Sequence, residues 1–257
     1  MNANQRDFLF EHGYLVLERW MPDQLLAELT ALTEQLFEAE GENAGSEFRQ
    51  EPNARRLANM VAKGEVFGRI MSNPEILGYV GSVLGPRFKL SSLNARSANP
   101  HSHSRQPLHV DMGLLPDDDG FSVCNTVWML DEFTSENGAL RVVPRSHRWG
   151  SRPQEGLPDP EGVHPDEILV TAPRGTVVIM NAHLWHGGTE NRTDAPRRAL
   201  HGFYCRWDIP QQQYQKRLIP PEVQAGFSPK LREVLALDDP HNDEISSPMT
   251  KASGFLK

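Results

Sequence analysis

The segment from residue 88 to 130 reads FKLSSLNARSANPHSHSRQPLHVDMGLLPDDDGFSVCNTVWML and changes the character of the chain. It holds three short runs of β-type sequence, separated by stretches rich in Ser, Asn, Pro, Asp and Gly that favour turns. Four more such runs follow with no helical pattern between them. This arrangement favours an antiparallel sandwich or barrel over βαβ units. The seven expected strands are 88–95, 107–113, 121–130, 139–144, 167–172, 175–182 and 198–207.

Helical patterns precede these strands. The opening stretch DFLFEHGYLVLERWM predicts the end of a helix, a turn at Gly13 and a strand. After Pro22, leucines recur at helical spacing, which predicts an amphipathic helix whose apolar side packs in the core. A second helix is expected between a cap at Ser72 or Asn73 and a stop at Gly85.

Because the helices come first and the strands follow, we expect one α+β domain, mainly β, over residues 1–257. The N-terminal helices should pack on the outside of the strands. The domain core is expected at about 7–208, and residues 209–257, rich in Pro, Gln and charge, should form a peripheral tail with one short helix in PKLREVLAL. The polar residues 41–56 are expected to form a loop.

The composition is that of a globular protein. Of 257 residues, 38% are hydrophobic and 23% charged, which allows a sizeable core and excludes a disordered chain. A net charge of −8 disfavours nucleic acid or an anionic membrane as the main partner. No stretch approaches the roughly 18 to 20 apolar residues of a membrane span. The polar start MNANQRDFLF lacks the apolar core of a signal peptide, so we expect a cytoplasmic location.

One pair of residues begins the pattern that carries chemistry. His109 and Asp111 lie two apart on an expected strand, so both side chains should leave the same face of the sheet. The strand at 175–182 runs into HLWHGG, which offers His183 or His186 as a third ligand. Two histidines and one carboxylate on one side of a metal leave three positions open, as in the non-haem Fe(II) oxygenases.

Four segments resemble, in order and spacing, the phytanoyl-CoA dioxygenase family of Fe(II)- and 2-oxoglutarate-dependent oxygenases. The resemblance runs from about residue 7 to 208. It implies a core that is a double-stranded β-helix, or jelly roll, in agreement with the number of expected strands. The four segments are FLFEHGYLVLERWM, LHVD, WMLDEFTSENGALRVVPRSHRWG and WHGGTENRTDAPRRALHGFYCRWD.

The resemblance implies a set of iron ligands, namely His109, Asp111 and His186. The stretch HGGTEN supplies the glycines and the asparagine that follow the second histidine in the family. His183 lacks this downstream pattern and is expected to be a strand-end or pocket-lining residue.

The resemblance also implies contacts to 2-oxoglutarate. Arg197 lies eleven positions after the second histidine, and a guanidinium can bind the distal carboxylate of 2-oxoglutarate through two parallel hydrogen bonds. Arg198 should face the other side of the strand, and the two exchange roles if Pro196 disturbs the pleat. Gln106, three residues before the first ligand, matches an amide that some members direct toward the co-substrate. Asn125 is a further polar candidate, the alternative being that it bonds backbone or caps a β-bulge.

Two positions depart from the family pattern. Arg145 replaces a turn glycine, so either the turn needs no positive φ or Arg145 tolerates the strain. Leu140 stands where close relatives often carry a threonine that touches the co-substrate. His101 and His103, in a loop rich in Ser, Asn and Pro, are expected to belong to a lid over the pocket; the alternative is a second metal site.

These inferences predict a dioxygenase that uses Fe(II), 2-oxoglutarate and O₂. We expect it to hydroxylate an unactivated C–H bond of a small-molecule metabolite, with release of succinate and CO₂. Hydroxylation is favoured because related halogenases replace the carboxylate ligand with a small residue. We expect no basic cradle for CoA phosphates. The expected pocket lining comprises Ser91, Ser92, Asn94, Arg96, Met112, Tyr204, Arg206, the loop 97–106 and the insertion 150–168.

Two other classes of function stay open. One is a jelly-roll protein that binds a metabolite without catalysis, and the other is a non-oxidative metal-dependent hydrolase or isomerase on the same scaffold. The oxygenase alone requires Arg197 together with all three metal ligands.

Overall fold

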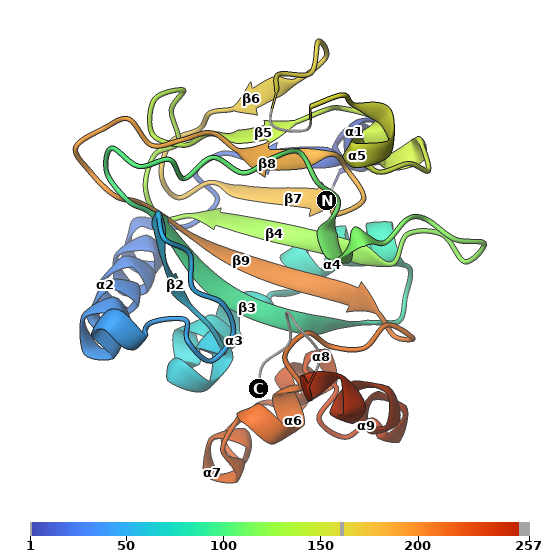
Figure 1. Cartoon of the computed structure of the whole chain (residues 1–257). Helices are drawn as coiled ribbons and strands as arrows, with labels where there is room; N and C mark the ends of the chain where they lie inside the picture. The colour runs from blue at the N-terminus through green and yellow to red at the C-terminus, as the bar shows by residue number, and fades with distance from the viewer. Residues whose placement is uncertain (1, 160–161, 252–257) are drawn as a thin grey trace.

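Two antiparallel β-sheets form the centre of the protein, seen in a computed structural model that describes residues 2–159 and 162–251 (Figure 1). The larger sheet has six strands in the order β1–β7–β4–β9–β3–β2, and the smaller has three in the order β6–β5–β8. The strands are β1 (Tyr14–Leu17), β2 (Ala54–Leu57), β3 (Phe88–Ala98), β4 (Val123–Met129), β5 (Leu140–Val142), β6 (Ile168–Val170), β7 (Val177–Asn181), β8 (His186–Gly188) and β9 (Arg197–Arg206).

Helices before and after the strands cover the larger sheet. Among the described residues, no helix is long and apolar enough to cross a membrane. The helices are α1 (Ala3–His12), α2 (Asp23–Glu40), α3 (Glu65–Met71), α4 (Pro74–Leu84), α5 (Pro153–Gly156), α6 (Gln215–Leu218), α7 (Pro221–Gln224), α8 (Pro229–Val234) and α9 (Pro240–Ser246).

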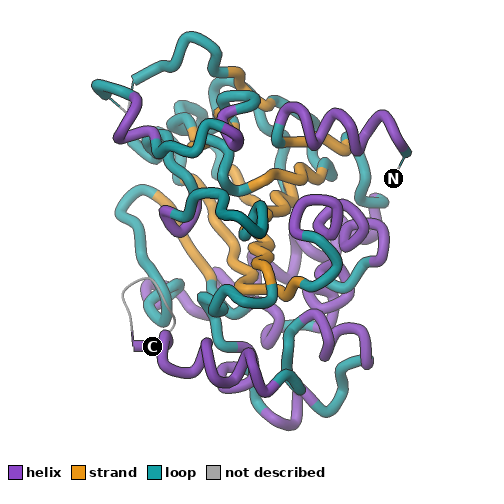
Figure 2. The backbone as a smooth tube through the Cα atoms, turned by 90° about the vertical axis from the view of Figure 1, so that its right-hand side faces the viewer, coloured by secondary structure: helices purple, strands orange, loops and turns teal. Residues whose placement is uncertain are grey.

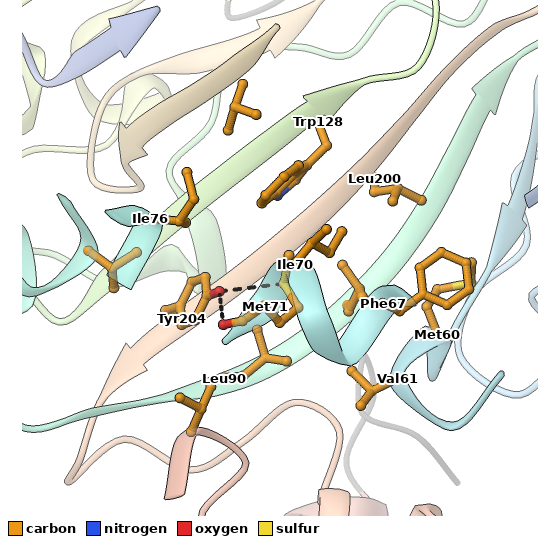
Figure 3. Close-up of a cluster of buried hydrophobic side chains, with 14 of the residues drawn as sticks. Met60, Val61, Phe67, Ile70, Met71, Ile76, Leu90, Trp128, Leu200 and Tyr204 are labelled. Carbon is orange, nitrogen blue, oxygen red and sulfur yellow. Dashed lines mark hydrogen bonds between the residues drawn. The ribbon is translucent and has the colours of Figure 1, made fainter. Parts of the chain in front are cut away.

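The main core lies between one face of the larger sheet and helices α1 to α4 and α8. Figure 2 shows these helices beside the strands rather than between them. In Figure 3, the Tyr204 hydroxyl donates to the backbone oxygen of Met71 at 2.9 Å, which links β9 to α3 inside this core. Among the buried residues that meet here are Met60, Val61, Phe67, Ile70, Ile76, Leu90, Trp128 and Leu200. The expected packing of the N-terminal helices on the outside of the strands is therefore confirmed.

A second, smaller core lies between the two sheets. Val127, Met129 and Met180 point from the larger sheet toward Leu140 and Val142 of the smaller one. Because side chains alternate along a strand, the opposite residues of β4, such as Trp128, belong to the main core. The functional site described below opens at the end of this space between the sheets.

The predicted helix boundaries are largely confirmed. Gly13 has a φ of 83° and ends α1, as the expected turn requires. Helix α4 begins at Pro74 with Asn73 as its N-cap, since the Asn73 side chain accepts the backbone N–H groups of residues 75 and 76. It ends before Gly85, where the stop was expected.

Two strand expectations are corrected. Residues 107–113 do not form a strand: His109 makes a single bridge to β8, and a 3-10 turn over Asp111–Gly113 follows at once. Met112 inside this turn has a φ of 54°, which breaks the strand pleat. The expected loop 41–56 contains the start of β2, which pairs with the edge of β3.

The tail is more structured than expected. In place of one short helix, it holds α6, α7, α8 and α9. Ile219, Leu231 and Leu237 are buried in the main core. The Gln211 side chain donates to the backbone oxygen of Leu90 at 2.8 Å, so the tail is tied to β3 by polar contacts as well. The apolar residues of this Pro- and Gln-rich segment explain why it packs on the sheet, because their burial removes apolar surface from water.

Candidate functional site

The site begins where two distant segments pair through their backbones. The His109 N–H donates to the His186 carbonyl at 2.9 Å, and the His186 N–H donates back to the His109 carbonyl at 3.0 Å. The Asp111 N–H donates to the Ala182 carbonyl at 3.0 Å. Backbone bonds thus bring the two segments together, although 77 residues of sequence separate the histidines.

Both histidine rings are held with one nitrogen pointing inward. Nδ1 of His109 donates to the Pro107 carbonyl at 2.9 Å, and Nδ1 of His186 donates to the Leu184 carbonyl at 2.8 Å. Nε2 of each ring is then left to face Asp111, at 3.8 Å from His109 and 3.5 Å from His186. Carbonyl partners of this kind fix the tautomer of metal-binding histidines. The ligand atoms of the three residues lie within 4.8 Å of one another.

The electrostatics of this cluster favour neutral rings. Burial first, and then the neighbouring His109, lower the pKa of His186 to about 4, although Asp111 acts in the opposite sense. Neutral imidazole is the form that binds metals. Asn125 donates its side-chain N–H to Asp111 and so orients the carboxylate. Its expected alternative role, bonding backbone or capping a bulge, is not seen.

Gly187, the residue after His186, is required by close packing. A Cβ atom there would lie 2.7 Å from the Gln106 carbonyl oxygen and 2.9 Å from that of Pro107. The first glycine of HGGTEN therefore lets the segment 106–109 approach β8 closely enough to place His109.

The remaining histidines of the motif regions lie outside the cluster. His183 is buried, accepts the Ser122 N–H at Nε2 (3.0 Å) and donates from Nδ1 to the Leu114 carbonyl (3.1 Å), so it connects strand ends as expected. His101 pairs with Asp194 at 2.6 Å on the surface. His103 is exposed and lies beside a neighbouring cavity. In the described part of the chain, no second group with metal-ligand geometry is found.

The two arginines of β9 face opposite sides of the sheet. Arg198 forms a two-pronged ion pair with Asp131, at 2.8 and 2.9 Å. Arg197 is 3% exposed and packs over the Phe133 ring at 4.2 Å. Its closest hydrogen-bond acceptor is the Asn137 carbonyl at 3.5 Å, and within the described residues it has no acidic partner. Burial, with help from a neighbouring arginine, lowers its pKa to about 9.

A buried guanidinium without a carboxylate is costly unless a ligand supplies one. Arg197 shares its strand face with His201 and Phe203, which line the cavity beside the histidine cluster. Arg197 itself is not among the lining residues. The strand pleat at Pro196 therefore keeps the expected register, with Arg197 on the site's side and Arg198 on the other.

The cavity beside the cluster has a volume of about 350 Å³. The expected lining residues Ser92, Asn94, Arg96 and Met112 are found there, as are Gln106, Asn125 and Leu140. Ser91 and Tyr204 are wrong as lining residues, because Ser91 is buried with its hydroxyl accepting the Gln212 N–H and the Tyr204 ring belongs to the main core. Arg206 is wrong as well, since it forms ion pairs with Asp117 and Asp208. The insertion 150–168 contributes no lining residue within its described part.

Arg145 adopts a φ of 73°, so the turn keeps the positive φ that the family's glycine implies. Its side chain pairs with Glu11 at 2.6 Å, away from the cavity.

Part of the cavity wall has no signal in the sequence. Arg49 and Arg56 come from the segment expected to be a loop, and Glu51 binds Arg56 and Arg96 together. No periodic pattern marks these residues, because they lie in irregular chain beside the short strand β2. His201 could have been found from the strand pleat, since it is four residues after Arg197.

Comparison with known proteins gives a consistent picture. The model of the phytanoyl-CoA dioxygenase family matches residues 9–199. The dioxygenase af480 of Aspergillus fumigatus is 32% identical over 174 residues, which cover 65% of this chain and only 54% of that protein, so the chain spans about half the length of this relative.

Solved structures share the fold. EctD from S. alaskensis, with 2-oxoglutarate and 5-hydroxyectoine, has a TM-score of 0.68 at 21% identity over 80% of this chain and 76% of that one. HygX from Streptomyces hygroscopicus, with nickel and 2-oxoglutarate bound, has a TM-score of 0.63 at 17% identity over 82% and 89%.

Proposed function

The chain belongs to the phytanoyl-CoA dioxygenase family, and with it to the 2-oxoglutarate-dependent non-haem iron dioxygenases, and from this premise we propose that it hydroxylates an unactivated C–H bond of a small-molecule metabolite. The observation that carries the proposal is the cluster of His109, Asp111 and His186, whose ligand atoms converge beside a cavity. When bound, Fe(II) and 2-oxoglutarate supply the O₂ chemistry that yields succinate and CO₂.

The donor set fits Fe(II). Two neutral imidazoles and one carboxylate are the facial triad of the non-haem iron oxygenases. We assign His109 Nε2, His186 Nε2 and an Asp111 oxygen as the metal-binding atoms, because the two Nδ1 atoms are engaged by carbonyl groups. Asn125 is a positioning residue, since it donates to the carboxylate ligand.

The surroundings also fit 2-oxoglutarate. Arg197 offers a buried guanidinium with no acidic partner in the described residues, and the distal carboxylate of 2-oxoglutarate supplies the missing charge. Arg198 is unsuited to this role because Asp131 already engages it. Gln106 lines the cavity next to His109, which supports its assignment as an amide contact to the co-substrate.

The substrate is proposed to be small. The cavity of about 350 Å³ must hold 2-oxoglutarate as well, and ligand sites usually measure about 300 to 1,000 Å³. The structural relatives EctD and HygX were solved with 5-hydroxyectoine and with hygromycin B, which are small molecules. Met112, Val127 and Phe203 supply apolar surface beside the cluster, against which a C–H bond can lie in a dry environment.

We further propose that the two sheets are the walls of a double-stranded β-helix. Antiparallel pairing and the core between the sheets support this arrangement. The burial of Ile219 and Leu237 against the sheet supports one domain that includes the tail. A cytoplasmic location stays a prediction from the sequence.

The decisive experiment adds Fe(II) and then 2-oxoglutarate to the protein under anaerobic conditions. We expect the weak visible charge-transfer band of the chelate, followed by succinate once O₂ is admitted. Iron-loaded protein that shows no band contradicts the proposed co-substrate. A band without succinate for any metabolite favours a binding protein, and turnover without O₂ favours a hydrolase or isomerase.

A further inference from the structure

Three arginines on the cavity wall share one carboxylate. Arg96 Nε lies 3.0 Å from Glu51, Arg56 also donates to Glu51, and Arg49 Nε lies 4.0 Å from it. Arg96 is 5% exposed and Arg56 14%, whereas Arg49 is 67% exposed. We call Arg49, Arg56 and Arg96 the arginine wall. One carboxylate among three guanidinium groups leaves a surplus of two positive charges, part of it buried.

The proposed metal and co-substrate do not remove this surplus. Of the described residues that line this cavity and its neighbour, the acidic ones are Asp111 and Glu51. Fe(II) contributes two positive charges and Arg197 one. They balance the negative charge of Asp111 and the two negative charges of 2-oxoglutarate. This balance holds whichever arginine touches the co-substrate. The arginine wall therefore still lacks two negative charges when the catalytic site is filled.

Two residues that line the cavity each carry a buried nitrogen atom without a partner in the part of the chain that the structure describes. Arg56 Nε and His201 Nε2 are buried and have no hydrogen-bond partner in the described residues. Both residues line the cavity. Burial first, and then nearby arginines with Arg56 foremost, lower the pKa of His201 to about 3, so its ring is neutral and adds no charge of its own. An unsatisfied N–H beside a charge surplus is suited to an oxyanion.

The arginine wall stands between two cavities. Arg49 and Arg96 line both the cavity at the metal ligands and a neighbouring one of about 360 Å³, as do Gln106 and His109. A small molecule held at the wall by one end can thus extend toward the apolar side chains near His109. Glu51 engages Arg56 with one oxygen and Arg96 with the other, and Arg96 also donates to the Ser104 carbonyl at 3.1 Å. A single carboxylate nevertheless neutralises only one of the two buried guanidinium charges, and the other costs desolvation free energy.

We propose that the substrate carries an oxyanion group, a carboxylate or a phosphate, that binds Arg49, Arg56 and Arg96 while its apolar part lies at the metal. This inference deepens the proposed function and rests on it. The expectation that the chain holds no basic cradle for CoA phosphates stays a prediction.

The test uses the full chain, loaded with Fe(II) and saturated with 2-oxoglutarate under anaerobic conditions, so that the metal and Arg197 are occupied. Isothermal titration calorimetry compares phenylacetate with phenylacetamide, and phenyl phosphate with phenol. We expect one anion to bind at least about tenfold more tightly than its neutral partner. The pair with the larger preference tells a carboxylate site from a phosphate site.

Three variants locate the preference. Arg49 is exposed, so the Arg49→Gln variant should keep the melting temperature of the parent protein. Its preference for the anion over the neutral partner should fall severalfold. Arg56→Lys keeps the charge but removes Nε, and we expect the preference to fall there as well. Arg55→Gln is the matched control, because Arg55 neighbours Arg56 on β2 but pairs with Glu34 on the other side.

The outcomes separate the two proposals. If the chelate band forms but anions and neutral partners bind equally, or no anion binds at millimolar concentration, the arginine wall is not a substrate site and the proposed function stands. Variants that change the melting temperature and leave the preference unchanged also overturn the inference. Failure of the chelate band overturns the proposed function, and this inference with it.

Discussion

The two walls of the cavity are held in place by different forces. At the metal wall, backbone hydrogen bonds join His109 to His186, and backbone carbonyls fix both rings. At the arginine wall, side chains from an irregular segment and from β3 meet around Glu51. Backbone pairing fixes the positions of atoms closely, whereas ion pairs of long side chains can be rearranged. The metal wall is therefore suited to a reaction that stays the same among relatives, and the arginine wall is suited to selecting the substrate, as we propose.

The largest effect is expected at the metal wall. His186→Ala should abolish metal binding and reduce succinate formation to background, because one of three ligands is lost. His183→Ala is the matched control: it should keep the metal and lower the free energy of unfolding by about 1 to 3 kcal/mol, since the buried Ser122 N–H loses its acceptor. The metal content of each variant measures metal binding, and urea denaturation measures the free energy of unfolding. Metal loss in the His183 variant instead would reverse the assignment.

Removal of the unpaired guanidinium comes next. Arg197→Ala should weaken 2-oxoglutarate binding by about 2 to 4 kcal/mol while the metal still binds, because a buried charged contact is lost. Arg198→Ala should break the ion pair with Asp131 and affect stability instead. Titration of the chelate band with 2-oxoglutarate gives both affinities. Should the Arg198 variant lose the co-substrate, the proposed side of β9 is incorrect.

A smaller effect on metal binding is expected at Asn125, which contacts the ligand Asp111. Asn125→Leu should weaken metal binding about 10- to 100-fold, because the Asp111 carboxylate loses the N–H that orients it. Thr126→Val tests the neighbouring position, whose hydroxyl donates to the Gly202 carbonyl on the opposite face of β4. Competition with a chelator measures the affinity. Equal affinities for the two variants would show that Asn125 does not act on the metal.

The last effect, on stability alone, is expected at the arginine wall. Burial raises the pKa of Glu51, but Arg96 and Arg56 outweigh burial and lower it from 4.5 to about 2. A lowered carboxyl pKa stabilises the fold above pH 4.5, and this stabilisation is lost as the pH falls through 2. Glu51→Gln should therefore lower the free energy of unfolding by about 1 to 3 kcal/mol at neutral pH. The difference from the parent should shrink in acid, and a constant difference would contradict the ion-pair account.

The difference between the walls also explains what the sequence could predict. His109, Asp111, His186 and Arg197 lie in short motifs with fixed spacing, and the structure brings the first three together. The spacing was informative although the strand expected around Asp111 is a turn, because the backbone bridge at His109 sets the geometry.

The arginine wall carried no such signal. Arg49 and Glu51 lie in a polar segment without periodicity, and their meeting with Arg96 depends on the pairing of β2 with β3. The helices of the tail lack a clear sequence signal for a similar reason. Its apolar residues, such as Leu231 and Leu237, are spread over short helices whose packing partners lie far away in the sequence.

The packing of the tail determines when, during synthesis, the cavity can form. Gln212 lines the cavity, and its backbone N–H donates to the Ser91 hydroxyl at 2.8 Å. Strand β3 leaves the ribosome more than a hundred residues before this partner does. A chain that has not reached Gln212 therefore lacks part of the cavity wall. The cavity can close only after residue 212 has been added, so the segments that come before it cannot form the finished site for metal or substrate by themselves.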